Sequence, residues 1–154
     1  MHDLNFDLVV IGSGPGGYVA AIRAAQLGLK TACIEKNSTL GGTCLNVGCI
    51  PSKALLQATD EYSHAKKMLS KKGIHVENLS FDLSEMMQHK DKVVSDLTKG
   101  IQHLFDKNNV KHISGTATIK QHNEVIVSTN NDEKITVKAS NIIIATGSAP
   151  VDLP

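Results

Sequence analysis

The chain has 154 residues, which is enough for one hydrophobic core and too short for two sizeable ones. Its 16 Lys and Arg residues nearly balance its 15 Asp and Glu residues. The chain therefore lacks the strong positive potential that would attract nucleic acid or an anionic membrane. The 3 cysteines do not make a secreted disulfide framework, and no apolar run approaches the roughly eighteen residues of a membrane span. We therefore expect a soluble, cytoplasmic protein with no signal segment.

The first element is a short apolar strand, followed directly by a glycine-rich turn and a helix. The pattern predicts the strand over 6–11 and the helix over about 15–27. Gly12, Gly14 and Gly17 fill the three glycine positions of a dinucleotide-binding fingerprint. One glycine permits the turn, one lets the backbone approach a pyrophosphate, and one permits close packing of helix on strand. The amides at the start of the helix would face the anion.

A second strand is predicted over 31–35 and closes with Glu35. An acidic side chain about twenty residues beyond the fingerprint can accept hydrogen bonds from a ribose. The alternative for Glu35 is an ordinary solvated carboxylate at a strand end.

Two cysteines, Cys44 and Cys49, stand close together at the start of an expected helix. A cross-link over so short a loop adds little stability, so chemistry is the better reason for the pair. Pro51 suits a first helical turn, which places Cys49 near a helix N-terminus, where the dipole favours a thiolate. The pattern indicates a redox-active disulfide.

The alternatives for this pair are two reduced, buried cysteines or half of a metal site. The spacing is CxxxxC rather than CxxC, and no second Cys or His pair stands at ligand spacing, so we expect no metal. Cys33 belongs to no motif and is expected in the core.

Two long helices and several strands follow. One long helix continues from the cysteines to about Ser70. Another begins at a capping box formed by Asp82 and Glu85. Period-two patterns then predict three antiparallel strands, over 112–119, 124–128 and 134–138. The continuous apolar run at 141–145 indicates a parallel strand buried on both faces.

These elements predict an α/β fold with one sheet. Strands 6–11, 31–35 and 142–145 should lie parallel and adjacent, with the first helix on one side and the three-stranded meander on the other.

With these motifs, the chain resembles the N-terminal, FAD-binding part of the dihydrolipoamide dehydrogenases, within the pyridine nucleotide-disulfide oxidoreductases. The resemblance covers essentially the whole chain and is most specific in GGTCLNVGCIPSK, residues 41–53. Leu45, Ile50 and 52–56 are more similar to the lipoamide enzymes than to the glutathione or mercuric reductases, which share the disulfide. The resemblance implies a FAD-binding Rossmann-like parallel sheet with an inserted three-stranded antiparallel meander, and a disulfide against the flavin ring.

The resemblance also implies roles for single residues. Cys44 would be the interchange thiol that reacts with dihydrolipoamide, and Cys49 would contact the flavin and form the charge-transfer species. Lys53 would lie near the flavin N5 edge, although a surface helix lysine is the plain alternative. The other cofactor residues implied are Glu35 and Lys36 at the adenosine ribose, Gly42 and Thr43 at the pyrophosphate, Ala117 at the adenine, and Thr146, Gly147 and Ser148 closing the site.

By the same resemblance, residues 1–148 would be the first segment of a FAD-binding domain, and 149–154 the start of a linker to an absent NAD-binding domain. A full-length protein would be a homodimer that serves the dihydrolipoyl domain of a 2-oxo acid dehydrogenase complex. The sequence holds no candidate for the family's His-Glu acid-base pair, so we expect an oxidoreductase fragment that is inactive alone. The alternatives are a natural short flavin-binding module without catalysis, or a glutathione- or mercuric-reductase-type flavoprotein.

Overall fold

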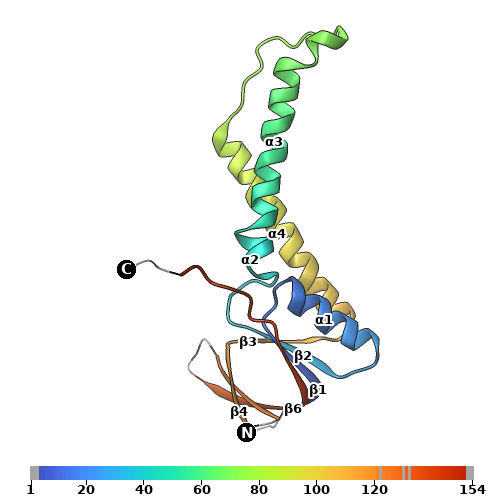
Figure 1. Cartoon of the computed structure of the whole chain (residues 1–154), viewed down its shortest axis with the longest axis vertical. Coiled ribbons are helices and arrows are strands. Elements are labelled where there is room, and N and C mark those ends of the chain that lie inside the picture. The colour runs from blue at the N-terminus through green and yellow to red at the C-terminus, as the bar shows by residue number, and fades with distance from the viewer. Residues whose placement is uncertain (1–3, 122, 130, 132, 152–154) are drawn as a thin grey trace.

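The computed structural model, which describes residues 4–151 apart from 122, 130 and 132, contains a six-stranded mixed sheet with helices packed on one face (Figure 1). The strands are β1 (Leu4–Ile11), β2 (Thr31–Glu35), β3 (Lys111–Ser114), β4 (Thr116–Gln121), β5 (Glu124–Ser128) and β6 (Lys134–Ile144). The helices are α1 (Pro15–Gln26), α2 (Gly42–Asn46), α3 (Cys49–Lys67) and α4 (Leu83–Lys107), with a short 3₁₀ turn, η1 (Ser70–Lys72).

The parallel half of the sheet has the order β3-β2-β1-β6. β1 lies parallel to β2 on one side and to β6 on the other, and β3 lies parallel to β2. The predicted parallel arrangement of the first, second and last strands is therefore confirmed, and with it the Rossmann-like α/β class.

The single strand expected over 112–119 is wrong. The chain breaks it at Gly115 into β3, beside β2, and β4, at the other end of the strand order. Gly115 has φ +150°, and a Cβ there would lie 2.5 Å from the carbonyl oxygen of Ser128. Because β3 and β4 follow one another directly, the sheet curls until its two ends meet at this glycine.

The two strands expected over 134–138 and 141–145 form one strand. Residues 134–138 of β6 pair antiparallel with β5, while most of the strand from Val137 onward pairs parallel with β1. The hydrophobic pattern changes where the strand gains a new neighbour, but the backbone stays extended. The meander β4-β5-β6 is confirmed, with its last strand shared by the parallel half.

Two apolar clusters pack against opposite faces of the parallel strands. The helix side buries Leu8, Val10 and Cys33 against Ala21 of α1 and Phe105 of α4. The other side buries further β1 and β2 residues against the meander, in a cluster that includes Val9, Ile34, Val125, Val127 and Val137. The meander therefore lies opposite α1, as predicted, and Cys33 is a core residue, as expected.

The helices α3 and α4 form an arm that projects from the sheet (Figure 1). α3 has no buried residue, and the buried residues of α4 are Thr98, Ile101 and Phe105, near its C-terminal end. The helix expected to reach Ser70 ends at Lys67, and η1 follows. The Asp82 half of the predicted capping box of α4 is confirmed, since the Asp82 carboxylate accepts a hydrogen bond from the Glu85 amide at 3.0 Å. Within the described residues, no helix combines the length and apolarity that crossing a bilayer requires.

Candidate functional site

A cavity of about 670 Å³ opens at the carboxyl ends of β1, β2 and β6. This is the point where the chain leaves β1 for β2 on one side and returns beside it as β6 on the other, and open parallel sheets bind ligands at such points. The walls come from five parts of the chain: 11–15, 34–37, the cysteine segment (residues 42–49), 115–117 and 145–148.

The turn beside the cavity depends on glycines, because a Cβ at these positions would collide with nearby backbone. Gly12 has φ +99°, and a Cβ there would lie 2.3 Å from the carbonyl oxygen of Ala145. A Cβ on Gly17 would lie 1.8 Å from the carbonyl oxygen of Gly12. Gly17 therefore does not line the cavity but allows α1 to pack directly beneath the turn.

A second close contact joins the fingerprint turn to the cysteine segment. A Cβ on Gly42, at φ +59°, would lie 2.6 Å from the Cα of Gly14. The Gly41 amide also donates to the Ser13 carbonyl oxygen at 3.0 Å. α1 starts at Pro15 with no acidic residue in its first turn and no side-chain cap. Its N-terminus is therefore open to an anion, and the glycine cradle fits a pyrophosphate.

Glu35 is a buried carboxylate at the end of β2, with 5% of its surface exposed. Its Oε2 accepts hydrogen bonds from the Ser13 amide at 2.8 Å and the Ser13 hydroxyl at 2.7 Å. Its Oε1 accepts from the Asn37 amide at 2.9 Å. Burial opposes ionisation, but these bonds and one from the Lys36 amide outweigh it and hold the pKa of Glu35 below its usual range. The alternative of a solvated strand-end carboxylate is therefore wrong.

Sequence reasoning missed Ser13, Asn37 and Gly115 as parts of this site. Ser13 is fully buried and supplies both bonds to Glu35 Oε2. The signal that could have identified Ser13 is a hydroxyl residue between two fingerprint glycines, because a hydroxyl in that turn can donate to the carboxylate at the end of the next strand.

The two cysteines lie at the cavity wall on separate helices. Cys44 is half-buried in α2, and Cys49 is exposed as the first residue of α3. This confirms the predicted position of Cys49 in the first helical turn, and it excludes the alternative of two buried cysteines.

Both thiols are free. The neighbouring Cys49 thiol, chiefly through hydrogen bonding, raises the pKa of Cys44 above its ordinary value, while the charge of Lys53 acts in the opposite direction. Burial and the charge of Glu35 raise the pKa of the core thiol Cys33 to about 12, so only Cys44 and Cys49 are placed for thiol chemistry. The described residues contain no cluster of His, Cys, Asp and Glu that could hold a metal ion.

The structure brings most of the predicted site residues together. The cavity is lined by Gly12, Gly14, Glu35, Lys36, Gly42, Thr43, Cys44, Cys49, Ala117, Thr146, Gly147 and Ser148. Lys53 lies outside this lining, on the exposed surface of α3 one turn beyond Cys49, and reaches the site through its charge.

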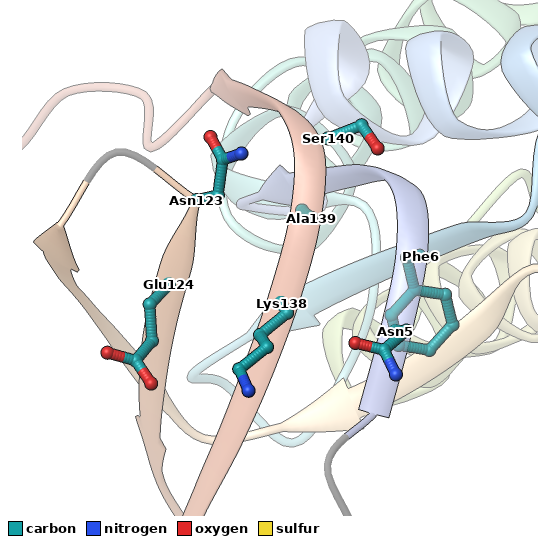
Figure 2. A pocket seen from close by; sticks show the side chains of 7 residues that line it. All are labelled: Asn5, Phe6, Asn123, Glu124, Lys138, Ala139 and Ser140. Carbon is teal, nitrogen blue, oxygen red and sulfur yellow. The ribbon is translucent and has the colours of Figure 1, made fainter.

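A second recess, of about 590 Å³, lies where β1, β5 and β6 run side by side (Figure 2). Glu124 and Asn5 are both register partners of Lys138. The lining residues are Asn5, Phe6, Asn123, Glu124, Lys138, Ala139 and Ser140, and none of them belongs to a predicted motif. The candidate site is therefore the cavity at the carboxyl ends of the strands.

Comparison with known proteins agrees with this geometry. The family model described as pyridine nucleotide-disulphide oxidoreductase matches residues 6–154. The chain is 55% identical over 148 residues to a mitochondrial dihydrolipoyl dehydrogenase of Pisum sativum, which covers 96% of this chain and 30% of that protein. It is 56% identical to a leghemoglobin reductase of Vigna unguiculata, covering 96% of this chain and 28% of the relative. A mitochondrial dihydrolipoyl dehydrogenase of Rattus norvegicus is 51% identical over 153 residues, covering 98% and 30%.

The chain thus spans less than a third of the length of these relatives. The expected cytoplasmic location is wrong, because relatives from pea, Arabidopsis and rat are mitochondrial. Balanced charge and few cysteines fit any reducing compartment, so composition could not distinguish the cytoplasm from the mitochondrion. The compartment is determined by a targeting segment.

Proposed function

Since the chain belongs to the pyridine nucleotide-disulphide oxidoreductase family, we propose that it is the FAD-binding part of a mitochondrial dihydrolipoyl dehydrogenase. Residues 1–148 would form the first segment of the FAD-binding domain, and 149–154 would begin the linker to an NAD-binding domain. The observation that carries the proposal is one cavity that joins a glycine cradle, a buried carboxylate and a free cysteine pair.

The lining suggests how FAD would be held. Gly12, Gly14 and the start of α1 would face the pyrophosphate together with Gly42 and Thr43, because the glycines have no side chain between their backbone and the cavity. Glu35 and Lys36 would hold the adenosine ribose, since the bonds to Glu35 keep its carboxylate ionised and oriented. The remaining assignments are Ala117 at the adenine, Thr146, Gly147 and Ser148 closing the site, Gly17 supporting the turn, and Lys53 near the flavin edge.

When bound, FAD would supply a two-electron acceptor beside the reduced cysteine pair, for onward transfer to NAD. The chain's own part is thiol-disulfide exchange. With the pair oxidised, a thiolate of a dihydrolipoyl group attacks Cys44 Sγ, the Cys44–Cys49 bond breaks, and Cys49 leaves as a thiolate. The second substrate thiolate then attacks the substrate sulfur of the mixed disulfide. Cys44 leaves, the substrate becomes a cyclic disulfide, and the pair has gained two electrons.

The positions of the two sulfurs suit these separate roles. Cys49 is the exposed first residue of α3 and lines the cavity, which suits the sulfur that leaves first. The Lys53 charge acts on Cys44 and favours release of the substrate disulfide. The full-length protein would be a homodimer that receives its substrate from the dihydrolipoyl domain of a 2-oxo acid dehydrogenase complex.

The test uses the 154-residue chain loaded with FAD and reduced with dihydrolipoamide. We expect a flavin spectrum that bleaches on reduction, and a Cys44→Ser variant that keeps the flavin spectrum but bleaches at least a hundredfold more slowly. A Cys33→Ala variant is the matched control and should bleach at the wild-type rate, because Cys33 is a core thiol. A dihydrolipoyl dehydrogenase and a leghemoglobin reductase match the chain at 55% and 56% identity, so the assay uses dihydrolipoamide itself as the reductant.

Two outcomes would contradict the proposal. Loss of flavin in Cys44→Ser would make the role of that cysteine structural. Undiminished bleaching in the same variant would remove Cys44 from the exchange.

A further inference from the structure

Asn46 holds together the segment that carries Cys44. Its Nδ2 donates to the carbonyl oxygens of Leu40, at 3.0 Å, and Gly42, at 2.9 Å. Its Oδ1 accepts from the Thr39 hydroxyl at 2.7 Å. Carbonyl oxygens can only accept, so the amide orientation follows from its partners, and both Nδ2 hydrogens and Oδ1 are used.

Apart from Asn46, the segment is held by Leu40 and by Leu45 of α2, which are buried in the helix-side core. α2 has five residues, too few for a helix to be stable by itself, and its N-cap Gly41 makes no side-chain cap bond. Gly41 and Gly42 are tied to the fingerprint turn by the Gly41 amide bond to Ser13 and the contact with Gly14. The Asn46 side chain extends that anchorage across α2, because one of its bonds ends on Gly42 and the residue itself closes the helix.

The turn between the cysteines runs from Asn46 to Gly48, which is the N-cap of α3. Gly48 packs closely on α2, because a Cβ there would lie 3.0 Å from the carbonyl oxygen of Thr43. Cys44 lies in α2 and Cys49 begins α3, so a tilt of α2 would change the position of Cys44 relative to Cys49. A disulfide tolerates only a narrow range of Cα and Cβ separations, so the stability of the Cys44–Cys49 bond depends on that tilt.

We propose that Asn46 is a positioning residue that sets the redox potential of the Cys44–Cys49 pair by fixing the orientation of α2. The inference rests on the proposed function, which requires the pair to form a reversible disulfide. The pair can be oxidised by the cyclic disulfide form of a dithiol reagent. Two S–H bonds of the pair then give one S–S bond, and two electrons and two protons pass to the reagent. Without Asn46 the two thiols meet less often, so disulfide formation becomes less favourable.

The test equilibrates the 154-residue chain in mixtures of oxidised and reduced dithiothreitol, followed by thiol alkylation and mass measurement. We expect Asn46→Ala and the isosteric Asn46→Asp to lower the equilibrium constant for disulfide formation about tenfold, which corresponds to about 30 mV towards a more oxidising potential. Thr39→Ala, which removes only the bond to Oδ1, should shift the potential in the same direction by less.

The matched control is Asn108→Ala. Asn108 Nδ2 donates to the Leu104 carbonyl oxygen at 2.7 Å, a bond of the same kind at the end of α4, so its loss should leave the potential unchanged. Circular dichroism and thermal melting identify the folded variants.

Failure of this inference is distinct from failure of the proposed function. A wild-type potential in folded Asn46 variants, or in Thr39→Ala if those variants do not fold, would overturn the positioning role. A wild-type chain that forms no disulfide in any mixture would overturn the proposed function.

Discussion

At the scale of single residues, Glu35 shows how a charge is kept in a nearly closed site. Its two oxygens accept bonds from Ser13 and Asn37, and their partners belong to segments that follow β1 and β2. Those donors compensate for the water that burial removes. The carboxylate therefore links the fingerprint turn to the next strand and presents a fixed acceptor to the cavity.

Replacing Glu35 by Gln should make stability less sensitive to acid. The pKa of Glu35 is lower in the folded chain than the ordinary value of 4.5, so its contribution is fully present above that value and is lost as the pH falls through the lowered pKa. In urea unfolding, the free-energy difference between wild type and Glu35→Gln should be large at pH 7 and should shrink at about pH 3. Glu61→Gln, on the exposed face of α3, should show little difference at either pH, and a pH-independent effect of Glu35→Gln would contradict this account.

The contact between Gly14 and Gly42 predicts a strong effect of one methyl group. Gly42→Ala adds a Cβ against backbone at a positive φ, and should destabilise the chain by about 1–3 kcal/mol and weaken FAD binding. Gly16→Ala is the matched control, because a Cβ there meets nothing within 4 Å and α1 should gain about 0.5–1 kcal/mol. Chemical denaturation and flavin fluorescence titration measure both effects. Equal stabilities of the two variants would refute the tight contact.

At the scale of secondary structure, α4 has two different halves. Its C-terminal half packs Ile101 and Phe105 onto the sheet, whereas its N-terminal half belongs to the projecting arm and exposes Leu83 and Met87. The helix is one continuous element because its cap and its amphipathic pattern are local. What each half contacts is decided by the sheet below it.

Substitutions of two phenylalanines test this difference between the packed end of α4 and the projecting arm. Phe105 is 0% exposed, so Phe105→Ala should cost about 3–5 kcal/mol. Phe81 lies just before α4, is 60% exposed and touches the Tyr62 ring edge to face, so Phe81→Ala should cost no more than about 1.5 kcal/mol. Urea unfolding of both variants is the measurement. Similar losses would mean that the arm is packed as tightly as the core.

At the scale of the whole molecule, the chain exposes apolar surface that a small α/β unit normally covers. Leu56 and Leu83 on the arm are each 62% exposed, and Ile144 at the end of β6 is 67% exposed. The relatives are more than three times as long as the aligned region, so they contain further chain that could contact such surface. The sequence itself contains one nucleotide fingerprint and the described structure one cavity built on it.

We therefore expect the FAD-loaded 154-residue chain to accept electrons from dihydrolipoamide without forming NADH. Transfer to NAD needs the nicotinamide oriented against the flavin, and loss of orientation alone costs several powers of ten in rate, on the order of 10⁵. The assay follows absorbance of NADH beside a full-length relative, with ferricyanide as an acceptor that needs no binding site. NADH formation within tenfold of the full-length protein would contradict this prediction.

Residues close together in the chain were enough to predict the local structure and much of the candidate site. The fingerprint turn, the start of α3 at the cysteines and the cap of α4 depend on residues within a few positions of one another, so their glycines, Pro51 and Asp82 were sufficient to predict them. The family segment at 41–53 supplied the chemical interpretation. For the same reason, most of the predicted cofactor residues were found at the cavity.

The way in which distant segments meet could not be predicted from the sequence and is known from the three-dimensional arrangement. The bonds from Ser13 to Glu35 span 22 positions, and the Gly14–Gly42 contact joins two loops that no periodic pattern relates. Gly115 divides one predicted strand between opposite ends of the sheet, and β6 merges two predicted strands because it has β5 and β1 as neighbours. Strand limits depend on which backbone is available for pairing, a non-local property, whereas turns and caps are set by the residues that form them.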